Sequence, residues 1–142
     1  MSIKALLAAR TKIRADPLLR AYFIERYGRD ARHFIGYKKV QNANDYPAIC
    51  YVPVSSSEPI SIGGMSNEQV SLVIGIYEPD IIDDVFNGVL ILSVIETMVL
   101  DCLNTGELGP NSVYLGKAKT TTDMGSRHPF YELEIAMPLA AR

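Results

Sequence analysis

The amino-acid sequence predicts an α+β fold: one mainly antiparallel, or mixed, sheet with a long apolar helix and N-terminal helices packed on it. Three observations predict this fold. The chain opens with a helical apolar pattern, it contains strand-like runs on both sides of a central segment, and that segment is long and apolar. Because 142 residues show neither an internal repeat nor a linker, we expect a single domain covering residues 1–142.

The first 28 residues have the pattern of two helices. Apolar side chains recur at helical spacing from the start of the chain. Asp16 and Pro17 have the composition of an N-cap followed by the proline favoured in a first turn, and Gly28 is a natural helix end. We therefore predict two helices with a break near Ala15, or one kinked helix. Residues 29–46 follow without a clear pattern, and HFIGYKKV within them fits either a short strand or an irregular crossing.

Two strands are expected before the long helix. In PAICYVPVSS, the internal Pro53 predicts a free strand edge, because proline cannot donate a ladder hydrogen bond. VSLVIGIYEP is β-branched and apolar on both faces, which indicates a central strand covered at least partly on both sides.

The Ser-, Gly- and Pro-rich residues 55–69 between these strands are predicted to form a long loop. We expect it to be loose in the free subunit and ordered against a neighbour, with part of it extending the strands into a hairpin arm. The alternative is a loop folded back on its own domain.

The long helix is expected to be the central core element. Asp80, Asp83 and Asp84 suit its N-terminus because acids meet the positive end of the helix dipole, and Gly106 ends it. Two strands, NSVYLGKAKTTT and FYELEIAMPL, then flank a polar loop at 120–129. The predicted core comprises Leu72, Ile74, Ile76, Val89, Leu92, Ile95, Val99, Leu133 and Ile135.

Charge is divided unevenly along the chain. Residues 1–39 carry ten bases and three acids, a net +7, and the remaining four bases and thirteen acids give −9. Such asymmetry is typical of a nucleic-acid or membrane contact, of the wet face of an amphipathic helix, or of copies that pack a basic segment on an acidic body. Sequence alone favours the wet helix face.

The side chains that could perform chemistry do not assemble into a site in the sequence. His128, Asp123 and Arg127 crowd one polar loop, which we interpret as turn chemistry. Glu132 and Glu134 could bind a cation, but a solvated strand face is favoured. We therefore predict that the protein is not an enzyme and binds no cofactor or metal.

Several other residues carry weaker expectations. Cys50 and Cys102 are expected to be buried reduced thiols, and His33 is expected at the surface. Glu96, on the apolar helix, fits an ion pair, a partner contact or a narrow wet stripe. Because polar residues interrupt the most apolar run and the start of the chain lacks a signal-peptide pattern, we expect a cytoplasmic product without a membrane span.

Five segments together have a familiar order: the N-terminal helix LLAARTKIRADPLLRAYFIERYG, the strand YPAICYVPV, a long loop to VSLVIGIYEP, the apolar helix DDVFNGVLILSVIETMVLDCLN, and a closing hairpin that ends in HPFYELEIAMPL. In this layout the chain resembles the tail terminator, or tail completion, proteins of long-tailed bacteriophages. The resemblance covers nearly the whole chain and lies in layout, size and strand character.

The resemblance implies a structural virion protein without catalytic residues. Such a protein forms a ring, commonly a hexamer, at the head-proximal end of the tail tube, stops tube growth and joins the tail to the head or neck. Its partners are copies of itself, the tail tube protein, and a neck, connector or head-completion protein. DNA passes through the ring without sequence-specific binding, and no membrane is involved. The implied location is the tail or neck of the virion, and the host cytoplasm during assembly.

Two other functions remain open: another neck, head-completion or baseplate assembly protein of a phage, and a non-viral small binding domain. For an assembly role, the charge split and the two polar loops indicate which residues contact partners. These interface candidates are Arg10, Arg14, Arg20, Glu58, Ile60, Ile62, Met65, Asp123, Arg127, His128, Glu132 and Glu134.

Overall fold

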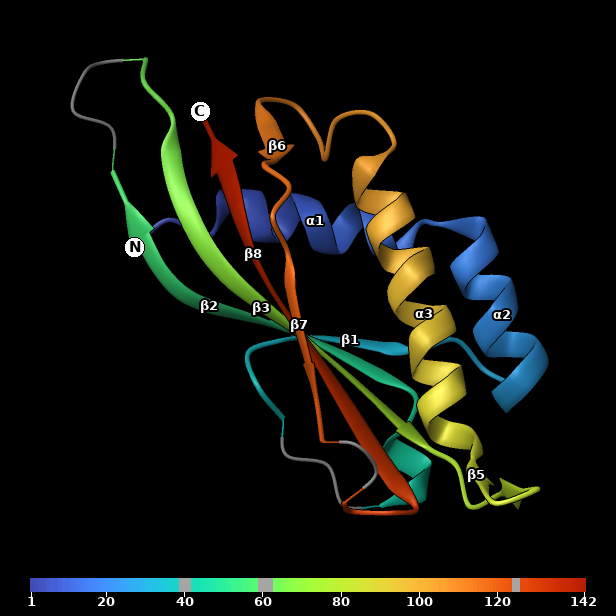
Figure 1. Ribbon diagram of the computed structural model, residues 1–142. Coiled ribbons are helices and arrows are strands. Elements are labelled where there is room, and N and C mark those ends of the chain that lie inside the picture. Colours follow the sequence, from blue (N-terminus) through green and yellow to red (C-terminus); the bar gives the residue numbers. More distant parts are fainter. Residues whose placement is uncertain (39–41, 59–62, 124–125) are drawn as a thin grey trace.

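The computed structural model describes residues 1–38, 42–58, 63–123 and 126–142 and confirms the predicted α+β class. Within these residues, helices pack against one curled sheet, and a small two-stranded hairpin projects beyond it (Figure 1). The elements are α1 (Lys4–Arg14), α2 (Pro17–Tyr27), β1 (Arg32–Ile35), the 3-10 helix η1 (Ala43–Asp45), β2 (Ala48–Ser57), β3 (Ser66–Tyr77), β4 (Ile81–Ile82), β5 (Val85–Phe86), α3 (Asn87–Asn104), β6 (Ser112–Tyr114), β7 (Lys119–Thr122) and β8 (Phe130–Ala141).

The large sheet is mixed, with the strand order β1-β2-β3-β8-β6, and β7 also pairs with β8. β1 runs parallel to β2, and every other pairing in this sheet is antiparallel. The inner face of the sheet and the helices share one hydrophobic core. The opposite, outer face carries Val73 and Glu134, which are partly or fully accessible.

The N-terminal helices form as predicted, with the break at Ala15. The carboxylate of Asp16 accepts a hydrogen bond from the Leu18 amide at 3.1 Å, which is the expected N-cap of α2. Gly28 ends α2 with a φ of 76°, a left-handed conformation in which glycine carries no steric penalty.

The expectation that Asp80, Asp83 and Asp84 open the long helix is wrong. Asp83 and Asp84 have φ values of 52° and 63° and form the two-residue turn between β4 and β5, so α3 begins only at Asn87. Turns of this kind need positive φ at both central residues, which Asp tolerates better than most residues. The acids therefore belong to a separate hairpin in front of the helix.

α3 is the core helix that the sequence predicts, although one side of it is exposed. By length and composition its 18 residues could cross a membrane, a property shared with core helices of soluble proteins. Its inward side packs on the sheet, where Gly88 lies so close to Tyr131 that an added Cβ would come within 2.4 Å of the ring. Its outward side exposes Leu90 and Val94.

The predicted core is buried except at one position. Val89 is 37% exposed, and the prediction for it is wrong, because Gly88 next to it takes the position that faces the sheet. The other predicted core residues are at most 4% exposed: Leu72, Ile74, Ile76, Leu92, Ile95, Val99, Leu133 and Ile135.

Much of the predicted loop at 55–69 is strand. β2 and β3 stay paired up to Ser57 and Asn67, so both strands extend into an arm within a single copy of the chain. Pairing by a neighbour is not needed for these residues, and ordering of the remaining segment by a partner stays a prediction. The free edge expected near Pro53 is confirmed, since β1 pairs with β2 only as far as Tyr51.

HFIGYKKV begins with the short strand that was one of two alternatives, since β1 ends at Ile35, and the described Tyr37 and Tyr46 lie over the outer face. The Tyr46 ring lies where a Cβ on Gly75 would come within 2.5 Å of it, and the Tyr37 hydroxyl donates to Glu132 on β8 at 2.9 Å. Tyr46 covers part of β3 from outside, which confirms that the central strand is covered on both sides over part of its length.

Candidate functional site

The predicted polar loop at 120–129 is wrong at its start, since residues 120–122 belong to strand β7 and pair with β8. The histidine of this segment has a structural role. His128 Nδ1 is hydrogen-bonded to the hydroxyl of buried Tyr131, and its ring meets Phe86 of β5 edge-on with centroids 5.2 Å apart. Backbone hydrogen bonds from the Ser126 amide to Asp123 and from the Phe130 amide to Arg127 form the turns of this loop. His128 therefore ties the loop to the β4–β5 hairpin.

Glu132 and Glu134 lie on the outer face of β8, as the alternation predicts. Glu132 accepts from Tyr37, and Glu134 accepts from the Ser71 hydroxyl at 3.0 Å. Partial burial and the hydrogen bond to Glu132 raise the pKa of Tyr37 to about 12, so its phenol remains a donor at neutral pH. Within the described residues, no group of three or more His, Cys, Asp or Glu side chains is arranged to hold a metal ion.

A shallow hollow of about 310 Å³ lies beside these carboxylates on the outer face. Its lining is mainly apolar, with valines from β2 and β3 and the acid Glu134 on β8. Val54, in the part of β2 beyond β1, is 61% exposed. This open part of the sheet could receive a protein surface with apolar and basic side chains.

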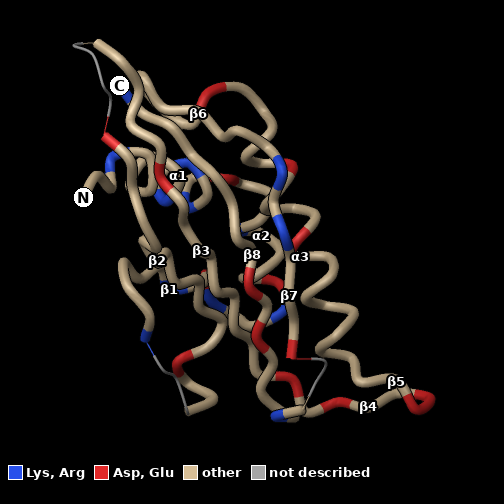
Figure 2. Tube along the Cα trace, turned by 60° about the vertical axis from the view of Figure 1, so that its left-hand side comes forward, with Lys and Arg blue, Asp and Glu red and all other residues tan. Residues whose placement is uncertain are grey.

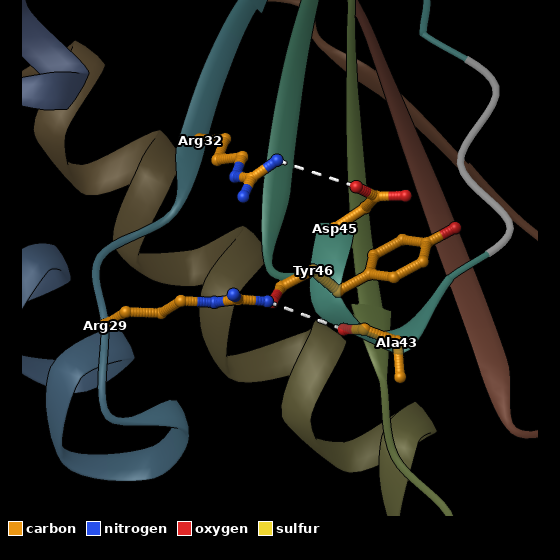
Figure 3. A network of polar contacts seen from close by, with 5 residues as sticks. All are labelled: Arg29, Arg32, Ala43, Asp45 and Tyr46. Carbon is orange, nitrogen blue, oxygen red and sulfur yellow. Dashed lines mark hydrogen bonds and ion pairs between the residues drawn. The ribbon is translucent and has the colours of Figure 1, made fainter.

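Several basic side chains of the N-terminal segment donate hydrogen bonds to main-chain carbonyl groups. Arg10 donates to the His33 carbonyl through both Nε and Nη2, at 3.2 and 2.9 Å. Arg29 donates to the carbonyl groups of Tyr46 and Ala43 (Figure 3). Lys4 and Lys12 donate to the carbonyl oxygens of Arg142 and Thr105. Several of the basic side chains in residues 1–39 therefore stabilise the fold of their own chain.

Ion pairs account for further bases, and two interface candidates stay accessible. Arg32 lies 3.5 Å from Asp45 in the network of Figure 3. Arg20 is 3.8 Å from Asp30, but its side chain is 64% exposed. Arg14 is exposed at the end of α1. Of the three arginine candidates in residues 1–39, Arg14 and Arg20 are therefore open to a partner, whereas Arg10 is engaged within the chain.

His33 is half-buried, so the expectation that it lies at the surface is wrong. Its Nδ1 lies 2.8 Å from the hydroxyl of Tyr51, and the two rings stack. Burial, assisted by the nearby Arg10 and Arg14, lowers the pKa of His33 to about 4. The imidazole is therefore neutral at physiological pH.

The arm carries the remaining interface candidates. Glu58 is exposed and accepts a hydrogen bond from the Ser66 hydroxyl at 3.2 Å, and Met65 is 37% exposed. Ile60 and Ile62 lie outside the described residues. The described part of the arm tip thus offers both a carboxylate and an apolar side chain to solvent.

Two carboxylates join distant elements: sequence reasoning missed Glu68, and it singled out Glu96 without identifying its partner. Glu68 on β3 is 1% exposed and accepts from the amides of Ala5 and Leu6 at 2.8 and 3.1 Å, so it holds the start of α1. Glu96 accepts from the Thr120 hydroxyl at 2.8 Å and thus links α3 to β7. Neither partner is near in sequence, and no local pattern indicates it.

Both cysteines are buried and free, as predicted. Cys102 lines a pocket of about 420 Å³ between the α1–α2 corner and the end of α3, together with Lys12, Asp16 and Asp101. Burial raises the pKa of Cys102 to about 11, which keeps its thiol protonated and unreactive at neutral pH.

Among the described residues, a group of exposed apolar side chains lies at the β4–β5 hairpin. Ile81, Ile82, Val85 and Phe86 are each between 42 and 58% exposed, and Leu90 on the first turns of α3 is 54% exposed. Figure 2 shows this hairpin projecting from the body with acids at its tip. The sequence signal was present, since an Asp-Asp pair separates two pairs of apolar residues.

Comparison of the sequence with protein-family models finds no matching family, and comparison with curated proteins finds no match either. The function must therefore be argued from the layout of the chain and from its exposed surfaces.

Proposed function

We propose that the protein is a structural component of a bacteriophage tail. In this proposal it forms a homo-oligomeric ring, a hexamer, at the head-proximal end of the tail tube, where it stops tube growth and joins the tail to the head or neck. It acts by occupying surfaces and performs no catalysis. The resemblance in element order and size supports this role.

The observation that carries the proposal is the exposed apolar surface at one end of the molecule. Four apolar side chains of the β4–β5 hairpin and Leu90 and Val94 of α3 are all more than 40% exposed. Monomeric soluble proteins rarely present contiguous apolar patches of this kind, which mark protein–protein contacts. A chain that belongs to an assembly has neighbours to cover them.

Two further surfaces fit the other partners that the role requires. The outer sheet face, with Glu134 beside the exposed Val54, and the adjacent loop containing Arg127 form one surface for a tube or neck protein. The β2–β3 arm, with Glu58 and Met65 near its tip, provides another. A ring with separate surfaces for its copies and for its partners can join two different structures.

Electron microscopy and mass measurement test the proposal. Purified protein is examined at low salt, alone and with tubes assembled from the tail-tube protein encoded in the same genome. The expected result is a six-membered ring, free or seated on one end of each tube. A protein that stays strictly monomeric and never joins a tube would overturn the proposal.

A further inference from the structure

The apolar hairpin, residues 80–86, is held in place by contacts with the body of the protein. The Phe86 ring packs against His128, and the Asn87 amide donates to the Asp80 carbonyl at 3.1 Å, which closes the base of the hairpin. An isolated two-stranded hairpin is marginally stable in water. Here the body of the protein holds it, while Ile81 and Ile82 stay at least half exposed.

A second exposed apolar surface runs along α2. Leu18, Ala21 and Ile24 follow at intervals of three residues and lie on the exposed side of this helix, while Leu19 and Phe23 face the core. Leu18 is 73% exposed. The α2 surface is therefore an apolar stripe without a cover in the described part of the chain.

The two surfaces differ in charge. The hairpin carries three exposed acids, Asp80, Asp83 and Asp84, and no base. On α2, Arg20 and Arg26 outnumber Glu25; Arg26 lies 3.9 Å from Glu78, and Arg20 remains 64% exposed despite its contact with Asp30. Two hairpins would repel each other, whereas a hairpin and an α2 surface attract.

The chain cannot cover its own α2 stripe with its own hairpin. The Arg26–Glu78 ion pair places the last turn of α2 at the base of the hairpin, and Figure 1 shows the hairpin beyond that end of the helix. Leu18 lies eight residues earlier, about 12 Å along the helix axis. A hairpin that covers Leu18 must therefore belong to another copy of the chain.

We infer that the apolar hairpin of one copy docks on the α2 stripe of a second copy. Apolar side chains of the hairpin cover Leu18, Ala21 and Ile24, and Asp83 and Asp84 face Arg20. Because the two copies use different surfaces, the contact is heterologous, and repetition of it generates a ring when the rotation closes. This inference rests on the self-association in the proposed function and names the surfaces that produce it.

Disulfide trapping between two separate chains tests the contact. Ile82→Cys is placed in one chain and Leu18→Cys in a chain of different tagged length. Both chains also carry Cys102→Ala, because Cys102 lines the same pocket as Leu18 and would pair with the new thiol within one chain. Cys50 is buried and does not compete. Oxidation of the mixture is expected to give mainly the mixed disulfide. The matched control replaces Ile82→Cys with Val54→Cys, which is equally accessible on the outer sheet face at 61% exposure and should give little product.

Charge reversal supplies a second readout that requires no cysteine. Asp83→Lys with Asp84→Lys should weaken self-association about tenfold or more, and Arg20→Glu should do the same. Mixing the two variants should restore association, because opposite charges then meet again. Glu107→Lys, in the exposed connection that follows α3, is the control and should leave self-association unchanged.

The outcomes separate this inference from the proposed function. One outcome is that rings form and join tubes, but no mixed disulfide appears and the charge reversals leave self-association unchanged. This would overturn the hairpin contact and leave the proposed tail role intact. Mixed disulfides in a protein that never joins a tube would support the contact and remove the tail role. A protein that is monomeric under every condition would remove both.

Discussion

Glu68→Ala should loosen α1 from the sheet. The Glu68 carboxylate is buried on β3 and accepts hydrogen bonds from the amides of Ala5 and Leu6 and from the Ser2 hydroxyl. The N-cap residue Ile3 supplies no side-chain cap of its own. Glu68 therefore provides from another element the acceptor that a helix N-terminus needs.

The expected loss of unfolding free energy follows from these contacts. A buried donor left without a partner costs about 1–3 kcal/mol, and removal of a helix cap costs about 0.5–2 kcal/mol. Two buried amides lose their acceptor in the alanine variant, so we expect a loss of about 3 kcal/mol in total. Glu68→Gln keeps one acceptor oxygen and should lose roughly half as much.

Urea unfolding followed by circular dichroism measures these differences. Gln69→Ala is the matched control, because Gln69 is the next residue on the same strand but is exposed; it should change the unfolding free energy by less than about 0.5 kcal/mol. A Glu68→Ala protein within about 0.5 kcal/mol of wild type would refute the assigned role. Faster amide exchange confined to α1 in this variant would support it further.

Three other predictions follow from the fold. Leu92 is 2% exposed, so Leu92→Ala should lower the free energy of unfolding by about 2–5 kcal/mol. Val89→Ala, on the outward side of α3, should lower it by less than about 1 kcal/mol. Equal losses would contradict the assignment of Leu92 to the buried side of α3 and of Val89 to the exposed side. Gly88→Ala should destabilise the protein by about 1–3 kcal/mol, since the new methyl would collide with Tyr131, and an unchanged melting temperature would contradict that packing. Because the pKa of His33 is lowered to about 4 in the folded state, the unfolded chain binds more protons than the folded one between about pH 4 and pH 6.5. The free energy of unfolding should therefore fall as pH drops through this range, by about 1 kcal/mol or less per pH unit. In urea titrations at several pH values, His33→Gln should remove this part of the slope.

Local signals in the sequence were sufficient for the class of the fold and most of its elements. Asp16 and Pro17 start α2 and Gly28 ends it, because capping depends on adjacent residues. Alternation along residues 130–141 correctly placed Leu133 and Ile135 inside and Glu134 outside, because side chains of a strand point to alternate faces. These features need no knowledge of distant parts of the chain.

Competing local signals were decided by tertiary contacts. Asp83 and Asp84 suit both a helix N-terminus and a tight turn; in the fold, a hairpin turn precedes α3 and its Phe86 packs on His128, more than 40 positions later in the chain. The serines of the β2–β3 arm read as loop, yet they pair as strand because β3 continues alongside β8 to Ala141 and offers β2 a template.

The candidate surfaces divide in the same way. The sequence by itself determined where the charges and the two polar loops lie along the chain, and the candidate contact residues were taken from these. Only the tertiary structure decided which of them remain available: Arg10 is bound to the His33 carbonyl, and Arg20 stays open. It also leaves Leu18 and Ile82 uncovered, which are not among the candidates that the sequence indicated. The physical reason is that hydrogen bonds and burial join residues far apart in sequence, and their partners are set by packing that no local pattern encodes.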